Sequence, residues 1–144
     1  MAADPFVSEF ARFKLIGALA VVPAILGCTR HERSRSVECT LKYAVTTSRV
    51  EVRATTKPYE VAALPVGERF SFKAVLRHVP HEKDALNLYV YDRERGGELL
   101  LQEVKYTAPF PGSSANAEFG FTGHQFVYSP SGREFEYWCA FKPL

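Results

Sequence analysis

Apolar and polar residues alternate with a period of two along most of the chain after residue 36. In the clearest stretch, residues 70–76, Phe70, Phe72 and Leu76 share one parity and mostly polar residues share the other. Successive side chains of a β-strand point to opposite faces, so this pattern predicts strands with one apolar face. Turn residues recur about every eight to twelve residues. The sequence therefore predicts an all-β fold, either a single antiparallel β-sandwich or a small β-barrel of about eight strands.

Polar and proline-rich segments mark the connections between the predicted strands. Thr47 and Ser48 predict a hairpin turn between the first two strands. Residues 58–67 contain two prolines and a glycine, which is typical of a crossing connection rather than of a central strand. Residues 109–116 are rich in loop-forming residues, and long ordered loops often carry binding residues. This loop is therefore a candidate binding region.

An apolar run over residues 15–27 precedes the β-rich part of the chain. Arg12 and Lys14 give the run a positive flank, and it is too short and too interrupted by glycine and proline to span a membrane, which takes about 20 residues. These features predict a signal peptide over residues 1–27. Asp4 and Glu9 in the leading segment leave open a start codon further downstream.

The end of this run, Ile25-Leu26-Gly27-Cys28, resembles the lipobox of bacterial lipoproteins. In that family the cysteine is lipidated and becomes the mature N-terminus. The resemblance implies a lipid anchor on Cys28 and a place in the bacterial cell envelope, facing the periplasm. Thr29 follows the cysteine in place of Asp, which by the same resemblance favours the outer membrane. Plain secretion without a lipid is the alternative.

The remaining chain divides into a short tether and one domain. Residues 28–37 carry three arginines and read as a basic tether, with attraction to anionic headgroups as a side effect. Residues 38–144 form the all-β domain, which is long enough for a single core. The net charge of +2 is small, and no basic patch interleaved with aromatic residues recurs in the domain, so a nucleic acid partner is disfavoured.

Two cysteines remain once Cys28 is assigned to the lipid. Cys39 shares its parity with Leu41, and Cys139 shares its parity with Phe135 and Tyr137. Both sulfur atoms should therefore point to the apolar faces of the first and last strands, where an oxidising compartment favours a disulfide. The two strands would be neighbours or face each other across the core. A reactive cysteine would need a base that the sequence does not place nearby.

Catalytic and metal-binding patterns are weak in this chain. Residues 78–84 contain two histidines and two carboxylates, but their spacing is not that of a known metal site, and a solvated turn is the simpler interpretation. His124, beside a glycine, is expected in a turn. Glu134 and Glu136 share a strand face, which is more typical of a solvent face than of an acid/base pair. The sequence therefore predicts no enzyme activity, no cofactor and no metal.

Three aromatic residues fall on strand faces opposite the apolar stripes: Tyr89, Tyr91 and Trp138. Tyrosine and tryptophan bury a large area at a small entropic cost and are common in binding hot spots. These residues are therefore candidates for a binding surface. The alternative is that both faces of their strands are covered.

Residues 129–135, Ser-Pro-Ser-Gly-Arg-Glu-Phe, resemble the Ser-x-Ser-Gly-x-x-aromatic loop of the bacterial membrane-bound c-type lysozyme inhibitors. Members of that family are small, disulfide-containing β-barrel lipoproteins of the periplasm. The resemblance implies that Ser131, Gly132 and Arg133 enter a lysozyme cleft, where they would meet its two catalytic carboxylates. It covers seven residues, and the later Trp and Lys-Gly pattern of the family is absent.

Taken together, these patterns predict a non-enzymatic cell-envelope lipoprotein whose β domain binds another envelope protein. One alternative is an inhibitor or immunity protein against a cell-wall hydrolase or a secreted toxin, which would capture its target with a protruding loop. A second alternative is a structural component of a secretion or adhesion assembly. That role predicts an exposed strand edge or aromatic patch.

Overall fold

The computed structural model describes residues 36–94, 96–110 and 118–142. The elements are β1 (Ser36–Tyr43), β2 (Thr46–Thr55), the 3₁₀ helix η1 (Pro58–Glu60), β3 (Leu64–Val66), β4 (Phe70–Arg77), β5 (Ala85–Asp92), β6 (Leu99–Thr107), β7 (Gln125–Tyr128) and β8 (Glu134–Phe141). The predicted all-β domain of about eight strands is confirmed. The predicted signal peptide, Cys28, most of the tether and most of the loop at 109–116 lie outside the described residues. No helix in the described ranges could span a membrane.

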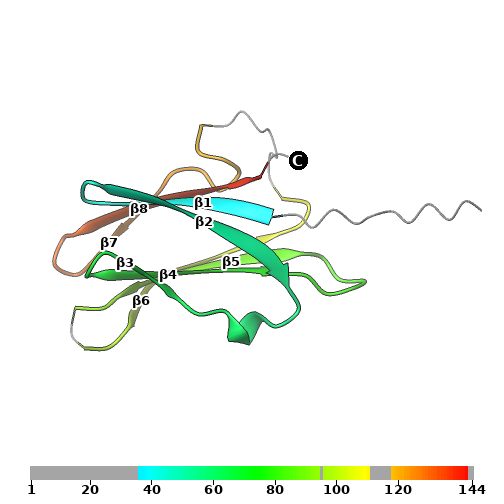
Figure 1. The fold of residues 1–144 in the computed structure, drawn as a ribbon, viewed down its shortest axis with the longest axis horizontal. Helices are drawn as coiled ribbons and strands as arrows, with labels where there is room; N and C mark the ends of the chain where they lie inside the picture. Colours follow the sequence, from blue (N-terminus) through cyan, green and yellow to red (C-terminus); the bar gives the residue numbers. More distant parts are fainter. Residues whose placement is uncertain (1–35, 95, 111–117, 143–144) are drawn as a thin grey trace, which may run out of the picture. The chain divides into compact units, whose positions relative to one another are not determined.

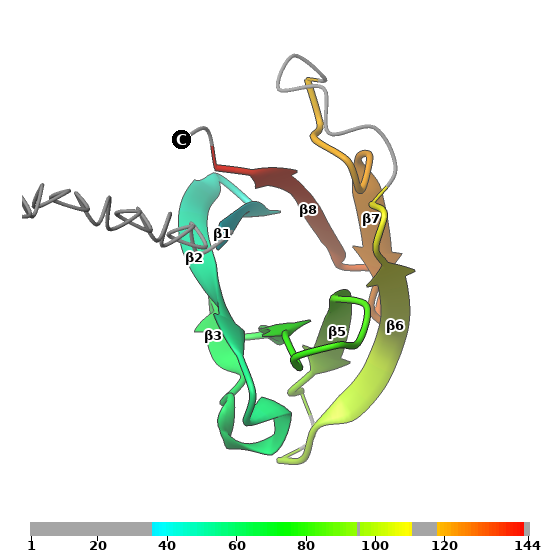
Figure 2. The same ribbon diagram turned by 90° about the vertical axis from the view of Figure 1, so that its right-hand side faces the viewer.

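The strands form one sheet in the order β6-β5-β4-β2-β1-β8-β7, and β3 pairs with β4 beside this path (Figure 1). The sheet curls until its two end strands, β6 and β7, lie on the same wall (Figure 2). It is therefore nearly closed into a barrel. β1 begins at Ser36, two residues before the domain boundary predicted from the sequence.

One strand pair departs from the predicted antiparallel arrangement. β2 and β4 are parallel, with Ala54 opposite Leu76 and Thr55 opposite Arg77, so the sheet is mixed. Parallel neighbours need a crossover of about a dozen residues or more. Residues 56–69 supply it, and they contain η1 and the short strand β3 in place of an unstructured connection. Alternation reveals which residues share a face but carries no information on strand direction.

The first hairpin also turns earlier than predicted. Tyr43 of β1 pairs with Thr46 of β2, so the turn consists of Ala44 and Val45 in place of Thr47 and Ser48. Ala44 has a positive φ of 53°, as tight two-residue hairpin turns require. Val45, which has the apolar parity of its strand, is consequently fully exposed at the turn.

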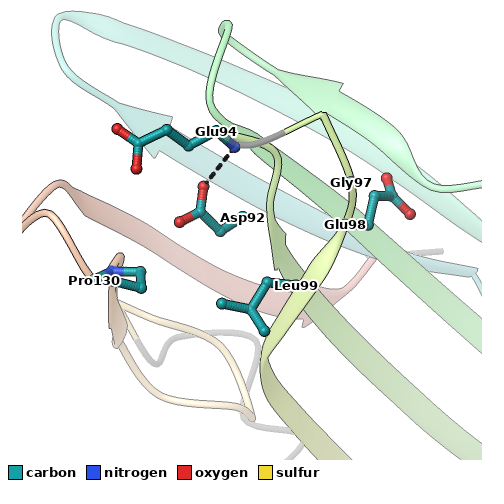
Figure 3. Close-up of a pocket in the computed structure, with 6 residues that line it drawn as sticks. All are labelled: Asp92, Glu94, Gly97, Glu98, Leu99 and Pro130. Atoms are coloured by element: carbon teal, nitrogen blue, oxygen red, sulfur yellow. Dashed lines mark hydrogen bonds between the residues drawn. The ribbon is translucent and has the colours of Figure 1, made fainter.

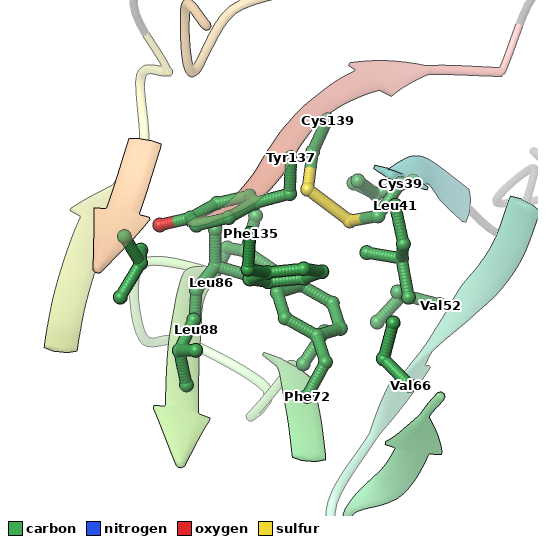
Figure 4. Packing of buried hydrophobic residues seen from close by; sticks show 14 of the residues in the cluster. Cys39, Leu41, Val52, Val66, Phe72, Leu86, Leu88, Phe135, Tyr137 and Cys139 are labelled. Atoms are coloured by element: carbon green, nitrogen blue, oxygen red, sulfur yellow. A yellow bond between two sulfur atoms is a disulfide. The ribbon is translucent and has the colours of Figure 1, made fainter. Parts of the chain in front are cut away.

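The core fills the inside of the curled sheet with the side chains that share the apolar parity of their strands. Phe70, Phe72, Leu86 and Leu88 are buried as the alternation predicts, and they meet the inward side chains of β8 (Figure 4). The Phe72 ring centroid lies 5.2 Å from that of Tyr137. Each such side chain contributes about 1.5–3 kcal/mol when it leaves water. The inward faces therefore hold the curl together.

The predicted disulfide between Cys39 and Cys139 is confirmed. The two cysteines are directly opposite each other in the β1–β8 ladder, and both are fully buried (Figure 4). Of the two arrangements left open by the sequence, the first and last strands are therefore neighbours. The disulfide joins positions 100 residues apart and fixes this part of the sheet covalently.

Candidate protein-binding surface

Four rings gather on the outer face of β7 and β8: Phe119, His124, Phe126 and Trp138. We call them the aromatic surface. The His124 ring lies at their centre, with centroid distances of 4.3 Å to Phe119, 4.2 Å to Phe126 and 5.1 Å to Trp138. Phe119 and Trp138 also meet edge to face at 5.4 Å. Aromatic pairs at these distances attract one another beyond their shared burial, so the four rings form one packed unit.

Gly120 allows the segment before β7 to carry Phe119 and His124 to this place. Its φ is +60°, and a Cβ atom there would lie 2.2 Å from the carbonyl oxygen of Cys139, so a residue with a side chain does not fit. The Phe121 N–H donates to that carbonyl at 3.1 Å. The Cys139 N–H donates in turn to Thr122 Oγ1 at 2.8 Å. These bonds attach the segment to β8 beside Trp138.

A charged group sits at the edge of the aromatic surface. Glu136 accepts a hydrogen bond from Lys42 Nζ at 2.7 Å, and its second oxygen lies 2.8 Å from His124 Nε2. The hydrogen bond from Lys42 lowers the pKa of Glu136, partial burial opposes that change, and His124 lowers the pKa further. Glu136 therefore stays ionised and is held by two partners, whereas Glu134 is exposed as the sequence suggests.

The outward side chains of β7 are the most exposed part of this face. Phe126 is 48% exposed, and the neighbouring Tyr128 is 59% exposed. Trp138, by contrast, is partly buried among the other rings. A hydrogen bond with Glu134 raises the pKa of Tyr128. The surface thus combines a fixed aromatic base with accessible rings along β7.

The three aromatic candidates from the sequence occupy two separate places. Tyr89 and Tyr91 lie next to each other on the outer face of β5, with ring centroids 6.4 Å apart. Burial is the main cause that raises the pKa of both hydroxyls. Trp138 lies on β8, and the strands β4, β2 and β1 separate β8 from β5 along the sheet. All three side chains are partly buried, and they do not form one site.

The turn at residues 129–133 presents the three residues of the second resemblance at its tip. Ser131, Gly132 and Arg133 are exposed. Ser129 is buried beneath them, and its Oγ accepts a hydrogen bond from the Arg133 N–H at 3.0 Å. The Ser129 N–H also donates to the Arg133 carbonyl at 2.8 Å. The turn therefore projects its tip from a base that is fixed by hydrogen bonds.

A hollow of about 340 Å³ lies between the β5–β6 hairpin and the β7–β8 turn (Figure 3). It is lined by Asp92, Glu94, Gly97, Glu98, Leu99 and Pro130. Arg69 pairs with Asp92, at 2.8 Å between Nε and Oδ1, and with Glu94. Ser71 donates to Glu98 at 2.9 Å. Three carboxylates thus line the hollow, and two of them share one guanidinium, so its lining is acidic.

His78 and His81, the other histidines in the described residues, lie apart from these features. His78 Nδ1 lies 2.8 Å from Asp84 Oδ1, and this contact spans the turn at residues 78–84, whereas His81 is exposed. No cluster of three metal-ligating side chains occurs among the described residues.

The aromatic surface contains residues that sequence reasoning assigned to other roles. His124 was expected in a turn, and Phe119 was not among the predicted site residues. The sequence signal that could have revealed this surface was Phe126, because its apolar ring lies at a position that faces outward from β7. No protein-family model, curated protein or solved structure matches the chain.

Proposed function

We propose that this chain is a non-enzymatic lipoprotein of the bacterial cell envelope whose β domain binds another envelope protein. The aromatic surface is the observation that carries the proposal. Aromatic side chains dominate protein-binding hot spots because they bury much area and lose little conformational entropy. Lys42 and Glu136 lie beside the rings and supply charged groups for a polar rim.

Two further features support recognition over catalysis. Glu136 is held by both Lys42 and His124, so its oxygens are already engaged. The rings around His124 are packed against one another and are held to β8 through Gly120, which gives the surface a preformed shape. A preformed surface binds with a smaller loss of entropy than a flexible one.

The test compares tagged full-length variants, cross-linked in growing cells and recovered from the envelope. Phe126→Ala with Trp138→Ala should lower partner recovery at least about tenfold, as expected for loss of a hot spot worth more than 1.4 kcal/mol. Tyr89→Ala with Tyr91→Ala is the matched control, because it removes two partly buried outer-face rings on another strand. Circular dichroism checks that both variants fold. Equal recovery of the partner by all three proteins would contradict the proposal.

The lipid anchor is tested separately. Metabolic labelling with a fatty acid should mark the wild-type chain and leave the Cys28→Ser variant unmarked, because the thiol of Cys28 is the proposed site of attachment. Sequencing the mature N-terminus should place it at Cys28. Label retained in the variant would exclude this part of the proposal.

The exposed tip of the turn at residues 129–133 supports a second candidate function, inhibition of a lysozyme-like cell-wall hydrolase. Ser131, Gly132 and Arg133 project from the fixed base at Ser129 and could enter a cleft. The test measures lysis of cell-wall substrate by c-type lysozyme with and without the protein. Inhibition that is lost in Ser131→Ala with Arg133→Ala, and kept in the aromatic variant, would favour this function over the first.

A further inference from the structure

The two end strands of the sheet run in opposite directions where they meet. Near the end of β6, Tyr106 Oη donates to the Thr122 carbonyl just before β7, at 3.3 Å. At the start of β6, Leu99 lines the same hollow as Pro130, which follows β7. We call this junction of β6 and β7 the seam (Figure 2).

The backbones of β6 and β7 are not paired at the seam. Among the described residues, no backbone hydrogen bond joins the two strands, and they are the two ends of the sheet. A side-chain hydrogen bond from Tyr137 Oη to Gln102 Oε1, at 2.8 Å, connects β6 to β8, the strand paired with β7. One edge of each strand therefore has N–H and C=O groups with no strand partner. Such an edge is a template for another strand.

Exposed apolar side chains concentrate on the same two strands. Seven large hydrophobic residues are exposed in the described part of the chain, and four of them, Leu99, Leu100, Phe126 and Tyr128, belong to β6 or β7. Proteins usually protect a free edge with charged residues or proline. The four residues of β7 include neither, and in β6 the first four residues, 99–102, are uncharged, whereas Glu103 and Lys105 follow them. The seam thus combines unpaired backbone with apolar side chains.

The acidic hollow lies at one end of the seam, between Leu99 and Pro130 (Figure 3). Its three carboxylates favour a basic side chain on any segment that lies along β6. This charge complementarity narrows the chemistry of the occupant to an extended polypeptide with a lysine or arginine near one end.

We propose that an extended segment of the partner protein adds as a strand to the free edge of β6 and places a basic side chain in the acidic hollow. This inference rests on the proposed protein-binding function and specifies how the partner is recognised. β6 is the receiving strand because it has nine residues, against four in β7. Main-chain hydrogen bonds supply affinity in this mode, and the flanking side chains supply specificity.

The first experiment locates the partner on the full-length protein in living cells. A photo-cross-linking amino acid replaces Leu100 or Tyr128 at the seam. As matched controls it replaces Val45 in the β1–β2 turn or Tyr59 in η1, two exposed apolar positions outside β6 and β7. Both seam positions should cross-link the same partner, and the controls should not. Mass spectrometry then identifies the cross-linked segment.

The second experiment tests whether that segment pairs as a strand. A synthetic peptide of the cross-linked segment is added to the protein, and amide hydrogen exchange is measured residue by residue. Edge amides of β6 should exchange at least about tenfold more slowly with the peptide bound, because new hydrogen bonds protect them. The variant Glu98→Gln should bind the peptide several-fold more weakly, and Glu60→Gln, which changes an exposed carboxylate in η1, should bind it normally.

The outcomes distinguish failure of strand addition at the seam from failure of the proposed protein-binding function. Cross-links from the control positions alone would overturn the seam and leave the protein-binding function in place. No cross-link from any of the four positions would count against both. Cross-links at the seam without protection of the β6 amides would overturn strand addition.

Discussion

Two junctions of the sheet are built differently: one pairs the first and last strands of the chain, and the other is the seam between the two end strands of the sheet. β1 and β8 pair along seven residue positions and are joined by the buried Cys39–Cys139 disulfide. β6 and β7 share no backbone hydrogen bond in the described residues, and Tyr137 of β8 donates a side-chain hydrogen bond to Gln102 of β6 beside them. The first junction holds two strands together by hydrogen bonds and a covalent bond, whereas the second leaves backbone groups without a strand partner. The unpaired edge of β6 is thus separate from the strand pair that the disulfide joins.

The largest expected effect comes from breaking the fixed junction. Replacing both Cys39 and Cys139 with alanine should destabilise the domain by about 4 kcal/mol, because the disulfide restricts a loop of about 100 residues in the unfolded chain. Denaturant unfolding monitored by circular dichroism measures this loss. Cys28→Ser should leave the free energy of unfolding unchanged, and an unchanged midpoint in the double variant would refute the structural role.

A second prediction concerns the attachment of the aromatic surface to the fixed junction. Gly120→Ala should cost about 2–3 kcal/mol, because a left-handed backbone is unfavourable for alanine and its Cβ would overlap the Cys139 carbonyl. Thermal unfolding is the measurement. Gly97→Ala is the matched control, since no atom lies within 4 Å of its added Cβ. Equal melting temperatures for the two variants would show that the segment is not attached as described.

A third prediction concerns the side-chain link between β8 and β6 beside the seam. Tyr137→Phe removes the hydrogen bond to Gln102 and should cost about 1 kcal/mol. Burial raises the pKa of Tyr137, so its hydroxyl stays protonated and donates this bond over the whole ordinary pH range. Denaturant unfolding measures the cost, with the exposed Tyr128→Phe as the control. A loss as small as that of the control would mean that the bond does not help to hold β6 against β8.

The smallest effect is a pH dependence at the aromatic surface. The pKa of Glu136 is lower in the folded chain than its usual value near 4.5, so its ionised form stabilises the fold at neutral pH. This contribution should disappear as the pH falls below about 4.5, and it should amount to less than about 1 kcal/mol because Lys42 is partly exposed. Unfolding between pH 6 and pH 3 should show the difference for wild type and not for Glu136→Gln. A parallel pH profile for the two proteins would contradict the ion pair.

The sequence predicted those parts of the fold that depend on the parity of side chains. Phe70, Phe72, Leu86 and Leu88 are buried, and the cysteines meet, because alternation decides which face each residue occupies. The parallel pairing of β2 with β4 could not be predicted, since alternation is identical in both directions. Val45 has the apolar parity of its strand, yet it lies in the hairpin turn. Its side chain does not indicate where the strand ends and the turn begins.

The candidate site was less predictable because it depends on contacts between distant positions. His124 joins the aromatic surface only because Gly120 brings its segment against Cys139. The residues next to Gly120 in the sequence do not indicate that contact. Tyr89 and Tyr91 were correctly placed on an outer face, but their separation from Trp138 follows from the strand order. Pairing order is a property of the whole chain and leaves no trace in a local pattern.

Trp138 is the single tryptophan of the chain, and it packs edge to face against Phe119 and His124. The intrinsic fluorescence of the protein at tryptophan wavelengths therefore comes from within the aromatic surface. The indole packs among rings that the proposed partner would cover, so the arrival of a partner would change its emission. Tryptophan fluorescence from Trp138 can therefore report occupancy of the aromatic surface without an added label.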